Sequence, residues 1–319
     1  MPSPRGTIAT ASPAIDPGGG YTSGYIGTGA LARRVHERWP EPWPRDESPA
    51  PRRCLALELQ VLGPVEIMRA GQPVALPGRT ATIIVAGLAL SPNRIVPNDA
   101  LIGWIWGARQ PASPRAALQS AVSRLRRLVG DDLIETAGPG YRMRASAEQL
   151  DLLRFLELTD TAADAANDGA PERALISLDR ALRLWRGFPL SNVVSPRLHR
   201  DMLPGLTERY LRAVEQRCEL CLRLGRYSVV VQELSVIVPQ HPFHERLAGQ
   251  LMIALVKSGR RADALAVYDR LRRALAEELG IDPGEALQAL QGRILRGEEG
   301  WVIQDRRNQP DWLRQLRDL

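Results

Sequence analysis

The sequence predicts an α+β domain followed by an all-α domain in a chain of 319 residues. Residues 55–145 alternate short β-prone runs with apolar helical periods, in the order strands, three helices, hairpin. Residues 151–297 show helical periodicity almost throughout, and part of this stretch repeats after 34 residues. A chain of this length holds about two domains, each large enough to bury a core.

The first domain opens with "LELQVLGPVEI", which predicts a strand interrupted at Gly63 and Pro64. The turn "AGQ" then leads into "PVALPG", which we expect to be a second short strand. The apolar stretch "TATIIVAGLAL" is typical of a buried helix that stops at "SPN". In "RIVPNDALIGWIWG", a short extended piece precedes a helix that we expect Asn98 or Asp99 to cap and Gly107 to end.

The third helix is "SPRAALQSAVSRLRRLVG", with Ser113 as N-cap, Pro114 at its first position and Gly130 past its end. The following "DLIETAGPGYRMR" predicts a hairpin. This order of elements is that of a winged helix with an extra N-terminal β-sheet. In such folds the third helix enters the major groove of DNA and the hairpin is the wing.

The third helix carries four arginines and no acidic residue, and no acid occurs between Asp99 and Asp131. Its apolar residues fall within an arc of about 140°, which leaves a polar open face. A helix face that contacts only solvent is expected to carry interleaved Glu or Asp. Short polar side chains flanked by guanidinium groups instead suit a groove, where arginines reach phosphates or guanine. The candidate DNA-binding residues are Arg115, Gln119, Ser120, Ser123, Arg124, Arg126, Arg127, Arg142 and Arg144.

Arg142 and Arg144 lie in the hairpin, where a wing arginine enters the minor groove or holds its phosphates. Tyr141 is expected to pack between the wing and the helices. Trp104 and Trp106 are two positions apart and cannot share one helix face. One of them is expected in the core and the other in an exposed patch.

The composition argues against several functions. The net charge of +6 permits a polyanionic partner. Lys257 is the only lysine and does not follow a P-loop pattern, so NTPase and kinase functions are not expected. The four histidines show no triad or metal grouping, and "CELC" (Cys218 and Cys221) lacks companion ligands. We therefore expect a core cysteine pair, surface positions for His241 and His244, and no enzyme, cofactor or metal.

The tails and the second domain complete the organisation. Residues 1–54 hold nine prolines and seven glycines and are expected to be a disordered extension. No long apolar run or secretory signal is found, so a cytoplasmic, nucleoid-associated protein without membrane contact is expected. Gly225 and Gly259 are 34 residues apart, the tetratricopeptide period, although Gly249 stands where such a repeat usually ends in proline. Another helix pair precedes them, and the tail (298–319) holds one more possible short helix.

These motifs resemble the SARP family, the antibiotic-pathway regulators of actinomycetes. The resemblance covers about residues 55–297 and rests on "LGPVEI", "ALIGWIWG", "ALQSAVSRLRRLVG", "ETAGPGYRM" and "ALAVYDRLRRALAEELGIDPGEALQALQGRIL". It implies an OmpR-type winged helix (55–145) and a bacterial transcriptional activator domain of tetratricopeptide-like helices (151–297). It also implies a stand-alone activator that binds direct repeats in promoter DNA and contacts RNA polymerase and its sigma factor. Ala116 and Ala121 depart from residues frequent in the family, so a different base preference is expected.

Two functional hypotheses follow. The first is a DNA-binding activator of secondary-metabolite (antibiotic) biosynthesis that acts as a homodimer on double-stranded promoter DNA. Its half-site centres are expected about one helical turn, ~10–11 bp, apart. The second is a tetratricopeptide-type adaptor whose winged helix has lost the ability to bind DNA and binds protein instead. The arginine cluster together with the wing distinguishes the two.

Overall fold

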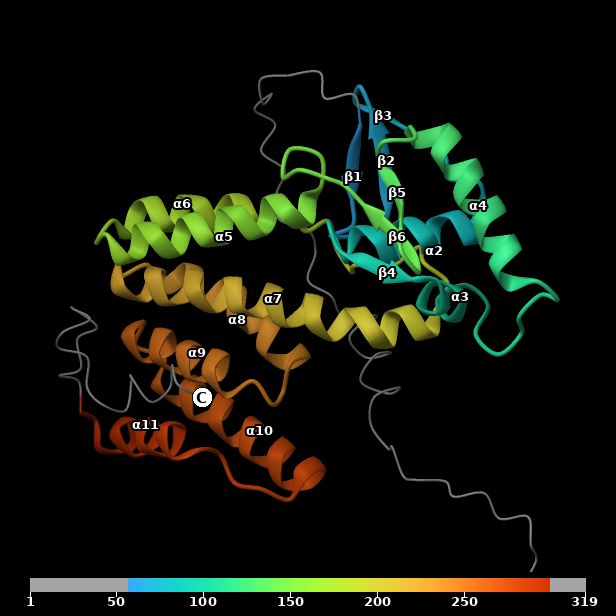
Figure 1. Cartoon of the computed structure of the whole chain (residues 1–319). Coiled ribbons are helices and arrows are strands. Elements are labelled where there is room, and N and C mark those ends of the chain that lie inside the picture. Colours follow the sequence, from blue (N-terminus) through green and yellow to red (C-terminus); the bar gives the residue numbers. More distant parts are fainter. Residues whose placement is uncertain (1–56, 299–319) are drawn as a thin grey trace, which may run out of the picture.

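The computed structural model describes residues 57–298, so the expectations for 1–54 and for the tail after 298 lie outside the described residues. It contains an α+β part followed by an array of antiparallel helices (Figure 1). The elements of the α+β part are β1 (Glu58–Gln60), β2 (Glu66–Arg69), β3 (Gln72–Pro73), α2 (Gly78–Ala89), β4 (Ile95–Pro97), α3 (Asn98–Trp106), α4 (Pro114–Val129), β5 (Ile134–Ala137) and β6 (Gly140–Met143).

The first sheet has the antiparallel order β1-β2-β3, and Leu59 pairs with Ile67 in its buried centre. The expected interruption between β1 and β2 is confirmed. Ala70 and Gly71 both have positive φ, as a tight hairpin turn requires. The expected strand over 73–78 is wrong, because β3 ends at Pro73. Val74 still donates its N–H to the Ile67 carbonyl (2.8 Å), but Pro77 has no N–H and is the N-cap of α2, so the chain leaves the sheet between these two residues.

The second sheet has the order β4-β6-β5, in which the expected hairpin forms two of the strands. Helices α2, α3 and α4 lie between and beside the two sheets, and α2 is buried along most of its length. The expected cap of α3 is wrong by one residue. Pro97 still has extended geometry and is the N-cap, whereas Asn98 is already helical and its N–H donates to the Pro139 carbonyl (3.0 Å).

The helical part stacks consecutive helix pairs (Figure 1). Its elements are α5 (Asp151–Asn167), α6 (Pro171–Leu182), α7 (Pro196–Arg223), α8 (Tyr227–Ile237), a 3-10 turn (Val238–Gln240), α9 (Glu245–Lys257), α10 (Arg261–Leu279) and α11 (Glu285–Arg296).

The turns of the first three helix pairs share one geometry. Gly169, Gly225 and Gly259 all have positive φ. The residue after each glycine donates its N–H to the carbonyl five positions earlier, at 2.9, 2.8 and 2.8 Å respectively. This is the hydrogen-bond pattern that closes a helix at a left-handed glycine. The spacing of 34 residues in the sequence therefore marks the repeat of one helix-pair turn in the structure.

Cys218 and Cys221 are buried on α7, as expected for a core pair. Across residues 57–298, no group of three or more His, Cys, Asp or Glu side chains is arranged to hold a metal ion. His241 and His244 are half-buried rather than on the surface. The reason for His244 is local, because its Nδ1 accepts the N–H of Leu247 (3.4 Å) and caps α9.

Hydrogen bonds join the two parts at several places. In the segment between α6 and α7, Asn192 Nδ2 donates to the Val65 carbonyl (3.0 Å) and Arg186 Nη2 donates to the Pro64 carbonyl (3.0 Å). The Asp151 carboxylate at the start of α5 accepts the N–H groups of Val61 (2.8 Å) and Leu62 (2.9 Å). On the other side, Trp104 Nε1 on α3 donates to Asp201 on α7 (2.7 Å), and the Ser195 hydroxyl donates to the Trp104 carbonyl (2.6 Å). The α+β part is therefore anchored both to the start of α5 and to the first turns of α7.

Trp104 is buried, as expected for one of the two tryptophans. Trp106 is only partly buried and packs against the core, so it does not form a separate exposed patch. None of the described helices has the length and apolar character needed to cross a membrane.

Candidate nucleic-acid interface

Helix α4 divides its surface between the core and solvent. Leu118, Leu125 and their apolar neighbours are buried against the other helices, while α4 itself lies at the outer edge of the α+β part (Figure 1). Six of the nine candidate DNA-binding residues lie exposed on its open face, namely Arg115, Gln119, Ser120, Ser123, Arg124 and Arg127. The helical period thus produces the polar face expected from the sequence.

The charge of this face is positive and largely uncompensated. Arg115 forms an ion pair with Asp99 (3.6 Å), but both side chains are more than 70% exposed. Such a surface pair contributes only about 0–1 kcal/mol, so Arg115 can exchange it for a phosphate. Arg124 and Arg127 have no ion pair or hydrogen bond to any side chain within the described part of the chain. The exposed face therefore presents three guanidinium groups and no carboxylate of its own.

Arg126 differs from its neighbours on α4. Its Nε donates to the Ile134 carbonyl (2.8 Å), and its Nη2 donates to the Thr136 hydroxyl (2.8 Å). Its guanidinium also lies over the Tyr141 ring, 5.8 Å from the centroid. The sequence groups Arg126 with the DNA contacts, whereas in the structure this side chain fastens α4 to the β5–β6 hairpin.

The two hairpin arginines share one carboxylate. Glu135 on β5 accepts from Arg142 Nε (3.0 Å) and Nη2 (2.7 Å), and from Arg144 Nε (2.8 Å). These bonds to Arg144 and Arg142 lower the pKa of Glu135, so this carboxyl stays ionised at neutral pH. The cluster of Glu135, Arg142 and Arg144 therefore carries a net charge of about +1, and Glu135 competes with any phosphate for both guanidinium groups.

Packing fixes the hairpin beside α4. Tyr141 is 5% exposed, as expected for a packing residue. Gly140 lies so close to β4 that a Cβ atom there would be 2.0 Å from the Val96 carbonyl oxygen. At the other end of the interface, the Arg69 guanidinium on β2 donates to the Leu128 carbonyl in the last turn of α4.

Sequence reasoning missed the roles of Glu135, Thr136 and Arg69. A signal for Glu135 exists in the hairpin register, because a loop at Gly138 and Pro139 places residues 135 and 142 opposite each other. No local pattern indicates the contact of Arg69, which comes from a strand 59 residues earlier.

An α+β unit with a basic exposed helix, followed by a helical array, is the arrangement of a bacterial transcriptional regulator. Residues 150–295 match the family of the bacterial transcriptional activator domain. The chain is 34% identical over 260 residues to the regulatory protein DnrI of Streptomyces peucetius, which covers 76% of this chain and 94% of DnrI. It is 37% identical over 259 residues to the regulatory protein AfsR of Streptomyces griseus, covering 80% of this chain but 26% of AfsR.

A solved structure of Mycobacterium tuberculosis EmbR, in complex with a low affinity phosphopeptide, matches with a TM-score of 0.69 and 32% sequence identity. The match covers 82% of this chain and 69% of the EmbR chain. The chain therefore belongs to the SARP family of transcriptional activators, as its motifs indicate. It spans about a quarter of the length of AfsR, so the activities of that longer protein do not transfer as a whole.

Proposed function

We propose that the protein is a sequence-specific DNA-binding transcriptional activator. Residues 55–145 act as an OmpR-type winged-helix domain with α4 as recognition helix and the β5–β6 hairpin as wing. Residues 151–297 act as a tetratricopeptide-like activator domain. The observation that carries the proposal is the open face of α4, where short polar side chains lie between exposed arginines and no acid interrupts them.

The residues of this face divide by chemistry. Arg115, Arg124 and Arg127 have the reach and charge for phosphates or for the O6 and N7 acceptors of guanine. Gln119 matches the paired donor and acceptor of adenine, and Ser120 and Ser123 allow the helix to approach base edges. These serines and the glutamine are assigned to sequence readout, and the arginines mainly to affinity.

The wing has a second role in this proposal. Arg142 and Arg144 bind backbone phosphates when these displace Glu135, whose carboxylate neutralises part of their charge in the free protein. Arg126, which the sequence groups with the DNA contacts, instead sets the distance between α4 and the wing.

The helical domain supplies the activating function. We assign it contacts with RNA polymerase and its sigma factor, and the chain acts as a homodimer on direct repeats of double-stranded promoter DNA. The protein works in the cytoplasm at the nucleoid, and its targets are genes of secondary-metabolite biosynthesis. The names of the relatives support this proposal: AfsR and DnrI are regulatory proteins, and EmbR is a transcriptional regulatory protein.

In vitro transcription tests the activating function. The template is the promoter region nearest the gene for this chain, transcribed by an actinobacterial RNA polymerase holoenzyme with and without the protein. We expect the protein to raise the amount of run-off transcript, and a Gln119→Ala, Ser123→Ala variant to lose most of this effect. If transcript amounts are unchanged and the protein does not shift the template, the chain is an adaptor whose winged helix no longer binds DNA.

A further inference from the structure

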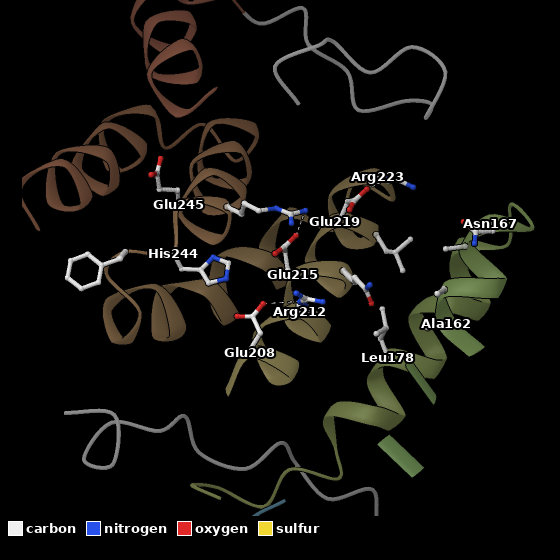
Figure 2. Close-up of a pocket in the computed structure, with 16 residues that line it drawn as sticks. Ala162, Asn167, Leu178, Glu208, Arg212, Glu215, Glu219, Arg223, His244 and Glu245 are labelled. Carbon is white, nitrogen blue, oxygen red and sulfur yellow. Dashed lines mark hydrogen bonds and ion pairs between the residues drawn. The ribbon is translucent and has the colours of Figure 1, made fainter. Parts of the chain in front are cut away.

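A groove lies in the helical part, away from α4. It encloses a volume of about 780 Å³ between α5, α7 and the segment that leads into α9. Figure 2 shows Ala162 and Leu178, from α5 and α6, across the groove from Glu215 on α7. Sites for small organic molecules occupy about 300–1,000 Å³, so this groove has the volume of a ligand site.

The two sides of the groove differ in character. Ala163 and Ala166 of α5 form an apolar wall with Ala162 and Leu178, and Asn167 is the polar residue on this side. Small side chains on this wall keep the groove wide. The other side is charged, because the groove-facing positions of α7 and the start of α9 hold Glu208, Arg212, Glu215, Glu219, Arg223, Glu245 and Arg246. A bound molecule would therefore meet hydrocarbon on one flank and ionised groups on the other.

The charges of the groove do not balance. Each of its three arginines is paired with a glutamate of the same groove: Arg212 with Glu208 (2.9 Å), Arg223 with Glu219, and Arg246 with Glu215. Glu245 is a fourth carboxylate, and it accepts the N–H of Gly284 (2.8 Å) rather than an ion pair.

Histidine does not supply the missing charge. Burial lowers the pKa of His244, so this side chain is neutral at pH 7. With Glu215 ionised, the groove therefore has one more negative than positive charge.

Glu215 is the most deeply placed of these carboxylates. Its side chain is 7% exposed, and Arg246 is its single ion-pair partner within residues 57–298. Burial raises the pKa of Glu215 to about 7, and the negative charges of Glu219 and Glu208 act in the same direction, against the effect of Arg246. A second cation near Glu215 would relieve this shortage of positive charge.

We propose that this groove is a binding site for a small organic cation, a primary ammonium or guanidinium group carried on an apolar body. The cationic group binds beside Glu215, and the apolar body lies against the alanine wall of α5. An anionic ligand would find all three guanidinium groups already paired and would add to the excess of negative charge. This site is separate from α4 and does not depend on whether α4 binds DNA.

Dansylcadaverine tests the site directly, because it joins a primary ammonium to an apolar fluorophore. Titration into the whole chain is followed by dansyl fluorescence, with dansylamide, which lacks the ammonium group, as matched probe. We expect saturable binding of dansylcadaverine and binding of dansylamide weaker by about tenfold or more. Equal binding of the two probes, or no saturable binding at millimolar probe, overturns the proposal.

Two variants place the probe in the groove. Glu215→Gln removes the buried charge and should weaken dansylcadaverine by about tenfold or more. Ala163→Trp fills the groove from an exposed position, so it should abolish binding while the circular dichroism spectrum stays unchanged. The control Glu277→Gln removes an exposed charge on α10 and should change nothing. If Glu215→Gln fails to fold, the Ala163→Trp variant alone tests whether the probe binds in the groove. Undiminished dansylcadaverine binding by Ala163→Trp would contradict the assignment of the groove as the binding site.

Discussion

The sharpest prediction concerns Arg124 and Arg127, the two exposed arginines of α4 that have no partner in the described part of the chain. Changing both to alanine should weaken DNA binding without weakening the fold. Neither side chain packs in the core, so the free energy of unfolding should change by less than about 0.5 kcal/mol. The effect on DNA binding should appear as a loss of salt dependence, because each arginine that neutralises a phosphate releases counterions.

The size of the expected loss of affinity follows from the number of phosphate contacts removed. Each phosphate contact contributes about 0.9 to the slope of log K against log salt concentration, so two lost contacts reduce the slope by about 1.8. If the native protein and the variant bind equally at about 1 M salt, the affinity of the variant at about 0.15 M falls by about 30-fold.

Fluorescence anisotropy with a labelled promoter duplex over a series of salt concentrations measures both quantities. The matched control is Arg173→Ala, Arg272→Ala, which removes the same net charge from exposed positions of the helical part. The control should retain the native slope. A native slope for Arg124→Ala, Arg127→Ala, or an equal loss in the control, would refute the assignment of phosphate contacts to α4.

Three further predictions concern the contacts that support this helix. Glu135→Gln frees Arg142 and Arg144 and should tighten DNA binding several-fold in gel-shift titrations. Because the pKa of Glu135 is lowered, the ratio of variant affinity to native affinity should be equal at about pH 6 and pH 8. An unchanged affinity would contradict the competition of Glu135 with phosphate for these arginines. Arg126→Ala should lower the free energy of unfolding in urea by about 1–2 kcal/mol, because it removes the hydrogen bonds to Ile134 and Thr136. It should also weaken DNA binding while the salt dependence keeps its native slope. A reduced slope would show that Arg126 contacts a phosphate. Gly140→Ala should cost about 3 kcal/mol or more in the same unfolding assay, since its Cβ would meet the Val96 carbonyl, and a native midpoint would exclude this close approach.

Much of the fold follows from local signals in the sequence. Pro114 and Gly130 mark the two ends of α4, and Gly225 and Gly259 mark equivalent turns of the helical array. The strand expected over 73–78 is cut short at Pro73, because Pro77 has no N–H for a strand ladder and instead precedes α2 as its N-cap. Local patterns therefore predict where elements begin and end, except where a backbone donor is absent.

The candidate site was predictable as far as helical periodicity extends. The period of 3.6 residues places Gln119, Ser123 and Arg127 on one open face, and all three are exposed. Arg126 lies at the border of the apolar arc, where periodicity alone does not decide between solvent and a neighbouring element. Its partners come from the hairpin, which depends on how β5 packs beside α4.

The junction between the two parts could not be predicted from local patterns. Asp151 meets the N–H groups of Val61 and Leu62 across about 90 residues of chain, and Trp104 meets Asp201 across 97. Each partner is unremarkable in its own segment. Such contacts are set by the packing of whole domains, and a single sequence contains no periodicity that reports them.

A DNase I footprint on the promoter region nearest the gene for this chain tests the central claim most directly. The account predicts protection of two direct repeats whose centres lie about one helical turn, ~10–11 bp, apart. This protection should be lost at the same protein concentration in the Arg124→Ala, Arg127→Ala variant. Absence of protection by the native protein, or equal protection by the variant, would contradict the assignment of α4 as the helix that reads DNA.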